Sequence, residues 1–188
     1  ARTQQVLLAM EFVTLVIFAI VALVKVYANH PAHSVTPNIS WFNPFDISSI
    51  SALNGGILLA VFIFWGWDSG VSVNEETEDS STAPGRAAII STFVLVGIYL
   101  LVTTAAQSFG GLSNLVNNQA DVFAPLGKGV LGSPLDKLLI IAVLTSASAS
   151  TQTTILPTAR TTLSMARAKA LPKAFGNVHP RFLSPGFS

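Results

Sequence analysis

Four long apolar runs constrain this chain more than any other feature of its sequence. They occupy residues 6–28, 52–74, 87–109 and 135–157. A helix needs about 20 residues to cross the hydrocarbon core of a bilayer, which is about 30 Å thick. In lipid, a helix satisfies its own backbone hydrogen bonds, whereas an open sheet does not. We therefore predict an all-α integral membrane protein with four transmembrane helices.

The composition excludes most soluble alternatives. Hydrophobic residues make up 51% of the 188 residues and charged residues only 10%, against about 25% charged in an ordinary soluble domain. The chain has no cysteine, so disulfides and thiolate metal sites are excluded. The first residues do not resemble a signal peptide. Because the chain lacks an initiator Met and ends on LSPGFS, we interpret it as a fragment of a longer protein.

Basic residues in the connections indicate which side each end of the chain faces. With four spans, the N-terminal end, residues 75–86 and the tail at residues 158–188 lie on one side. That side carries Arg2, Arg86, Arg160, Arg167, Lys169, Lys173 and Arg181, whereas the other carries Lys25, Lys128 and Lys137. Cytoplasmic loops are enriched in Lys and Arg, so we expect a multi-pass cell membrane protein with the first side in the cytoplasm.

The second run contains a carboxylate flanked by glycines, in the sequence FIFWGWDSGVSVN. Asp68 within the hydrocarbon costs on the order of 2.5–3.5 kcal/mol at the bilayer centre and less toward the edge. Gly66 and Gly70 each weaken a helix by about 1 kcal/mol relative to Ala. We interpret this as a helix interrupted within the membrane, because irregular backbone is tolerated there when it lines a cavity. The alternative is that the helix ends at Asp68, at the inner interface.

The fourth run contains TSASASTQTT, residues 145–154, which is almost wholly small or hydroxylated. Such residues allow close helix packing; alternatively, they line a polar pathway, for which Ser148, Thr151 and Gln152 are the candidates. Pro157 is expected to end or kink this helix. The basic tail that follows is expected to lie along the cytoplasmic interface.

Two charged residues lie within the first run. Glu11 is about five residues from its start and either snorkels to the interface or faces the bundle interior. Lys25, near the other end, is expected to snorkel outward.

Other function classes find little support. An enzyme would need a catalytic or metal constellation, but neither H-E-x-x-H nor G-x-S-x-G occurs, and two of the three histidines form HPAH in one loop. We therefore predict no enzyme activity, no metal site and no catalytic residue. No segment indicates nucleic-acid binding. A channel would need a filter loop or pore symmetry, and neither is visible in the sequence.

Three stretches resemble the amino acid–polyamine–organocation permeases, a superfamily of secondary transporters. FIFWGWDSGVSVNEETEDSSTAPGRAA is similar to the sixth helix and following loop of that family. LPTARTTLSMARAKALPKAFGNVHPRFLSP is similar to the end of the eighth helix and the next loop, and RTQQVLLAMEFVTL to the start of the fifth. The resemblance implies a leucine-transporter-type inverted-repeat fold of about twelve helices, of which this fragment would hold the fifth to the eighth.

The resemblance also implies a function and a set of site residues. It implies secondary active transport of an amino acid or related amine by alternating access, with H⁺ or Na⁺ as a possible coupling ion and no other cofactor. A non-transporting membrane subunit or channel-like protein is the alternative. The partners implied are the substrate, the lipid bilayer and the remaining helices. By motif position, the substrate-binding residues are Phe62, Trp65, Gly66, Trp67, Asp68 and Ser69.

Coupling and gating residues follow from the same comparison of motifs. Asp68 matches a position that is acidic in several members, and Glu11 falls where many members carry a Lys, so this sequence departs from that pattern. Ser148, Thr151 and Gln152 are further coupling candidates. Glu75 and Glu76 are expected at a cytoplasmic gate, paired with Arg86 or Arg160, or else form a solvated charge cluster.

Overall fold

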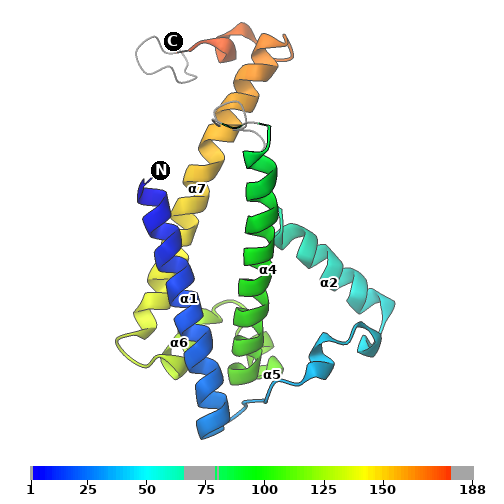
Figure 1. Cartoon of the computed structure of the whole chain (residues 1–188), viewed down its shortest axis with the longest axis vertical. Coiled ribbons are helices and arrows are strands. Elements are labelled where there is room, and N and C mark those ends of the chain that lie inside the picture. Colours follow the sequence, from blue (N-terminus) through cyan, green and yellow to red (C-terminus); the bar gives the residue numbers. More distant parts are fainter. Residues whose placement is uncertain (1, 66–78, 80, 179–188) are drawn as a thin grey trace. The chain divides into compact units, whose positions relative to one another are not determined.

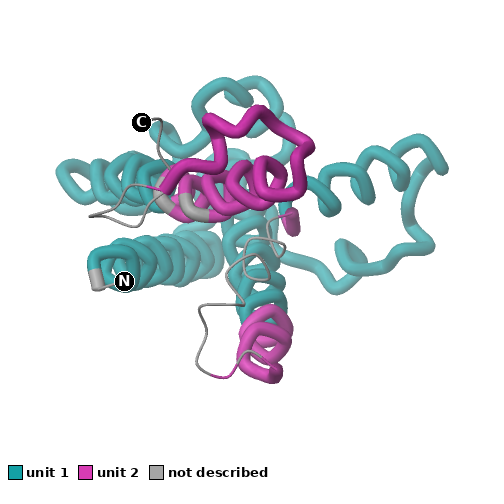
Figure 2. The backbone as a smooth tube through the Cα atoms, turned by 90° about the horizontal axis from the view of Figure 1, so that it is seen from above, with its two compact units in different colours: residues 1–63, 91–149 teal, residues 64–90, 150–188 magenta. Residues whose placement is uncertain are grey.

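The computed structural model describes residues 2–65, 79 and 81–178, and the regular structure of these residues is helical (Figure 1). The elements are α1 (Arg2–Asn29), η1 (Ile39–Phe42), η2 (Pro44–Asp46), α2 (Ile50–Ile63), α4 (Ala83–Gly110), α5 (Leu112–Asn117), α6 (Phe123–Val130), α7 (Asp136–Arg167) and η4 (Lys173–Gly176). The chain divides into two compact units, residues 1–63 with 91–149 and residues 64–90 with 150–188 (Figure 2).

Three of the described helices are long and apolar enough to cross a membrane. They are Thr3–Asn29, Ala83–Gly110 and Asp136–Arg167, which correspond to the first, third and fourth predicted spans. The second predicted span is described only in part, because α2 has 14 residues and ends at Ile63. At 1.5 Å per residue α2 is about 21 Å long, shorter than the hydrocarbon core.

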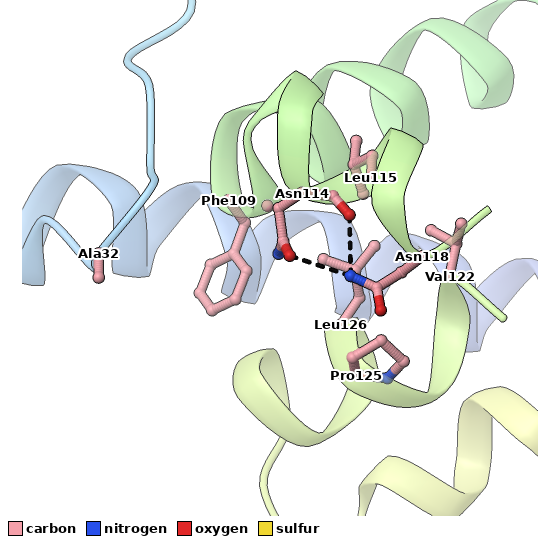
Figure 3. A pocket seen from close by; sticks show the side chains of 9 residues that line it. Ala32, Phe109, Asn114, Leu115, Asn118, Val122, Pro125 and Leu126 are labelled. Carbon is pink, nitrogen blue, oxygen red and sulfur yellow. Dashed lines mark hydrogen bonds between the residues drawn. The ribbon is translucent and has the colours of Figure 1, made fainter.

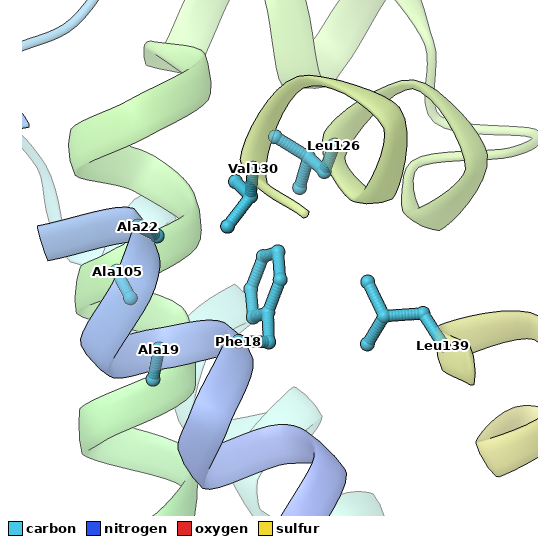
Figure 4. Packing of buried hydrophobic residues seen from close by; sticks show 7 residues of the cluster. All are labelled: Phe18, Ala19, Ala22, Ala105, Leu126, Val130 and Leu139. Carbon is cyan, nitrogen blue, oxygen red and sulfur yellow. The ribbon is translucent and has the colours of Figure 1, made fainter. Parts of the chain in front are cut away.

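The core of the first unit forms where one face of α1 meets α6. Phe18, Ala19 and Ala22 of α1 are fully buried, and they cluster with Ala105 of α4, Leu126 and Val130 of α6, and Leu139 of α7. Figure 4 shows the Phe18 ring in the middle of this group, pointing toward α6 and α7. The alanines provide the room for the ring, since small residues let helix backbones approach closely.

The same unit brings the C-terminal ends of α1 and α4 together with the start of α7. The backbone N–H of Val35, beyond α1, donates to the carbonyl of Ser108 in α4 at 2.7 Å. Lys25 Nζ donates to the carbonyl of Gly129 in the last turn of α6 at 3.1 Å. A cation is favoured there because the carbonyls at a helix C-terminus carry partial negative charge. Successive transmembrane helices cross the membrane in opposite directions. The four spans predicted from the sequence therefore also place the C-terminal ends of α1 and α4 and the start of α7 on the same side of the membrane.

A glycine with positive φ makes the tight link between α4 and α5. Gly111 has φ +69°, and a Cβ at this position would lie 2.5 Å from the carbonyl oxygen of His33. Residues other than glycine rarely adopt this conformation, and a side chain here would also push against backbone. Gly111 therefore allows residues 30–35 to pack on the end of α4.

Pro157 is expected from the sequence to end or kink the fourth helix, and it does not end it, because α7 runs ten residues further, to Arg167. A proline removes only one hydrogen bond of the ladder, here the one to the carbonyl of Thr153, so the rest of the ladder can continue. Thr158 Oγ1 donates to the carbonyl of Thr154 at 2.7 Å, a further bond within the helix. The helix ends instead at a Schellman turn, in which Lys169 has φ +62° and Ala170 N–H donates to the carbonyl of Met165 at 2.8 Å.

We predict that Gly111→Ala destabilises the full-length protein more than Gly132→Ala does. Both glycines have φ near +70°, but a Cβ on Gly132 has no atom within 4 Å. Both variants place a Cβ on a residue with positive φ, which costs about 1–3 kcal/mol, and only Gly111→Ala adds overpacking of about 1–3 kcal/mol. Thermal unfolding in detergent measures the difference. Equal losses in the two variants would show that the contact with His33 is unimportant.

Candidate functional site

The last turn of α2 leads into the stretch where the sequence predicts a substrate site. Phe62 lies in that turn, and Phe64 and Trp65 form a turn directly after the helix ends. The helix therefore ends three residues before Gly66. The side chains of Phe62 and Trp65 are 63% and 68% exposed, respectively. Two large aromatic rings with most of their surface exposed are suited to contact with lipid, with other protein segments or with a ligand.

Several of the predicted site residues lie outside the described residues. These are Gly66, Trp67, Asp68 and Ser69 of the predicted interruption and Glu75 and Glu76 of the predicted gate. The side chain of Gln152 is likewise not described. Their roles stay predictions from the sequence.

Several hydroxyl groups of α7 bond to carbonyls of their own helix. Ser148 Oγ donates to the carbonyl of Leu144 at 2.9 Å, and Thr145 Oγ1 donates to that of Ala142 at 2.9 Å. Thr154 Oγ1 bonds to the carbonyls of Ser150 and Thr151 in the same way. Each hydroxyl donor is thus satisfied within the helix, which lets it lie in an apolar environment. Each oxygen keeps lone pairs, so it can still accept a hydrogen bond from a cationic or N–H ligand.

Glu11 lies on the inward face of α1. Its side chain is half-buried, and it is seven residues before Phe18 and eleven before Ala22, both fully buried. Residues at these spacings share one face of a helix, since each turn has 3.6 residues. Of the two alternatives drawn from the sequence, this register favours the bundle interior over snorkelling.

The two candidate gate arginines lie in the second unit. Arg86 is exposed in the first turn of α4, where its backbone N–H donates to the carbonyl of Thr82 at 3.1 Å. Arg160 is half-buried in α7, three residues after Pro157.

Asp79 organises the start of α4, a role that the sequence reasoning missed. Its carboxylate accepts hydrogen bonds from Thr82 Oγ1 at 2.5 Å and Ser81 Oγ at 3.0 Å. Its carbonyl accepts the N–H of Ala83 at 3.0 Å. The Thr82 hydroxyl above all, together with that of Ser81, lowers the pKa of the Asp79 carboxyl. The signal was present as an acid and two hydroxyl residues just before an Ala-Pro helix start.

A small pocket, also missed at first, lies where the chain after α1 meets the end of α4, α5 and α6. Its volume is about 90 Å³. It is lined by Ala32, Phe109, Gly110, Asn114, Leu115, Asn118, Val122, Pro125 and Leu126. Figure 3 shows Asn118 beside Asn114, whose backbone and side-chain oxygens accept from Asn118 Nδ2 at 2.9 and 3.0 Å. Because four separate segments build this pocket, no local sequence pattern marked it.

Comparison with known proteins places the chain among transporters. The sequence profile of the family described as amino acid permease matches residues 1–186. This chain belongs to the amino acid permease family. The permease family is one of membrane transporters and not of enzymes, in agreement with the prediction from the sequence.

Three curated relatives are also transporters by name. They are uncharacterized transporters from Mycobacterium bovis and from two strains of Mycobacterium tuberculosis, each 31% identical to this permease chain over 130 residues. The aligned region covers 68% of this chain and 29% of each relative. The chain thus spans under a third of the length of these relatives. No solved structure matches the chain significantly.

We predict that Asp79→Ala lowers the thermal stability of the full-length permease near neutral pH and that this loss shrinks in acid. A carboxyl group whose pKa is lowered on folding stabilises the protein above its unfolded pKa, about 3.9. That contribution disappears as the pH falls through the folded pKa. Thermal unfolding of both proteins in detergent between neutral pH and about pH 3 measures it.

Asp79→Asn is the matched control, because its amide oxygen can still accept one hydroxyl but does not titrate. At neutral pH the thermal stability of Asp79→Asn should lie between that of the wild type and that of Asp79→Ala. A loss in Asp79→Ala that stays constant with pH would contradict a role for the charged carboxylate.

Proposed function

We propose that the full-length protein is a secondary transporter that moves an amino acid or related amine across the membrane by alternating access. The observation that carries this proposal is the family match over residues 1–186. The uncharacterized transporters similar to this chain support the same general activity. The proposed substrate class, an amino acid or related amine, rests on the motifs at residues 62–79. These motifs contain polar residues within an apolar run.

In this proposal the fold is of the leucine-transporter type. Helix α1 would be the fifth helix of about twelve, α2 the first part of the sixth, α4 the seventh and α7 the eighth. The arrangement within the first unit supports this order, because the ends of α1 and α4 meet the start of α7. The inverted repeats themselves involve helices beyond this chain.

The proposed substrate site is the interruption that follows α2. The helix ends at Ile63 after 14 residues, directly before the predicted interruption. Backbone carbonyls at an interrupted membrane helix are natural acceptors for a substrate ammonium group. Phe62 would cover the bound substrate, the backbone from Trp65 to Ser69 would contact it, and Asp68 would balance its charge or carry a proton.

Two further groups are proposed to line a polar path. Glu11 lies on the inward face of α1, and an ionisable residue in a bundle interior is typical of ion or proton pathways. Ser148 offers an oxygen that can accept a hydrogen bond while its own proton is held by Leu144. These residues, together with Thr151 and Gln152, are the proposed coupling positions.

The sidedness in this proposal rests on the seven Lys and Arg residues of one set of connections against three of the other. The N-terminal end, residues 75–86 and residues 158–188 would face the cytoplasm. Glu75 and Glu76 would lie at the cytoplasmic mouth, where Arg86 and Arg160 are the candidate ion-pair partners.

The test is uptake by the full-length protein in proteoliposomes. A panel of labelled amino acids and amines is offered with a pH gradient, with a sodium gradient and with neither. We expect at least one member to accumulate, and one gradient to drive it. If nothing in the panel responds to either gradient, the transporter proposal fails, and a non-transporting subunit or a channel-like protein becomes the better interpretation.

We predict that Asp68→Asn changes the pH dependence of this uptake without preventing membrane insertion. The amide keeps the size and hydrogen-bonding shape of the carboxylate but carries no titratable proton. Uptake rates across a pH series, normalised to the amount of inserted protein, measure the effect. Ser69→Ala is the matched control at the neighbouring position, and we expect it to alter the rate without moving the pH profile. A profile identical to that of the wild type would reduce Asp68 to a structural role.

A further inference from the structure

The C-terminal part of α7 extends well beyond what a bilayer core can hold. The helix has 32 residues, so it is about 48 Å long, whereas the hydrocarbon core is about 30 Å thick. If the apolar part begins near Leu138, about 20 residues bring the helix to Pro157. The stretch from there to Arg167 therefore projects on the order of 15 Å into the headgroup layer and beyond it.

This projecting end carries positive charge without any acidic residue. From residue 138 onward the sequence contains neither Asp nor Glu, but five Lys and Arg residues: Arg160, Arg167, Lys169, Lys173 and Arg181. Among those that the structure describes, Arg167, Lys169 and Lys173 are exposed. We call these three residues the basic end of α7.

The fold holds the basic end together. The Schellman turn reverses the chain at Lys169, and η4 follows three residues after it. A Cβ placed on Gly176 would lie 3.5 Å from the Cβ of the buried Ala166. Since Gly176 is the last residue of η4, η4 ends close to the last turn of α7.

The cations of the basic end are not needed to satisfy the helix terminus. The N–H groups of Lys169 and Ala170 already donate to the carbonyls of Ala166 and Met165, at 3.1 and 2.8 Å. The side chains of Arg167, Lys169 and Lys173 can therefore point their N–H donors outward. Arginine and lysine donors match phosphate oxygens, and arginine can bind them in a bidentate manner.

We propose that the basic end of α7 binds the headgroups of anionic phospholipids. Its depth supports this partner, because the apolar part of the same helix fixes it next to the headgroup layer. Electrostatic attraction to an anionic membrane extends over about one Debye length, about 8 Å at physiological ionic strength. Long Lys and Arg side chains bridge the remaining distance. The contact would anchor α7 at this end, independently of which substrate the protein carries.

The test measures lipid retained by the purified full-length protein. Protein in mixed micelles of phosphatidylglycerol and phosphatidylcholine is examined by native mass spectrometry. The variant replaces Arg167, Lys169 and Lys173 by Gln. Near an anionic surface each removed charge weakens binding about fivefold, so we expect the triple variant to retain phosphatidylglycerol on the order of a hundredfold less than the wild type. Phosphatidylcholine retention should not change.

The matched control replaces Lys128 and Lys137, which are exposed residues of α6 and α7 in the first unit, by Gln. We expect this control to retain nearly as much phosphatidylglycerol as the wild type. A further control, Arg167→Lys, keeps the charge and should keep most of the binding. Monodisperse protein and unchanged thermal unfolding in phosphatidylcholine show that the triple variant is folded.

Three results would overturn the proposal. One is equal retention of phosphatidylglycerol by the wild type and the triple variant. Another is an equal loss in the Lys128 and Lys137 control, which would indicate a general charge effect. The third is complete release of the lipid by millimolar inorganic phosphate, which would assign the site to free phosphate. These measurements do not involve substrate uptake. The lipid-binding proposal can therefore fail or hold independently of the transport proposal.

Discussion

The absence of water from the hydrocarbon core is the constraint on which the rest of this structure depends. Every backbone N–H and C=O within the core must find a partner in the protein. The three long apolar helices α1, α4 and α7 meet this requirement along their length. The same requirement explains the hydroxyl groups of α7, which donate to carbonyls of their own helix. The same need for backbone hydrogen-bond partners applies where α2 ends at Ile63, because the last carbonyls of any helix need partners from outside that helix.

Close helix contacts in the first unit depend on small residues. Ala19, Ala22 and Ala105 leave room for the ring of Phe18 between α1, α6 and α7. Gly111 supplies the left-handed turn by which the chain after α1 contacts the end of α4. Lys25 then links α1 to the carbonyl of Gly129 at the end of α6. Within lipid there is little hydrophobic force between helices, so packing and polar contacts of this kind hold them together.

The charges outside the spans have distinct tasks. Asp79 gathers the hydroxyls of Ser81 and Thr82 before α4, where a negative charge also complements the helix dipole. The basic end of α7 sits at the opposite kind of terminus, a C-terminal one, where cations are favoured. Its carbonyls are already bonded through the Schellman turn. This leaves the cations available to a membrane surface, as we propose.

The sequence by itself determined the membrane class, the positions of three spans and the family, because apolar runs of bilayer length and local motifs are contiguous along the chain. It also predicted an interruption at residues 66–70, which lie outside the described residues; the described helix α2 ends at Ile63. Only the tertiary structure decided that the face of α1 shared by Glu11 and Phe18 is buried, that Lys25 bonds to Gly129, and that four segments enclose the pocket near Asn118. It also decided that α7 continues past Pro157. Most of these features arise from contacts between residues distant in the sequence, which the order of residues alone does not show.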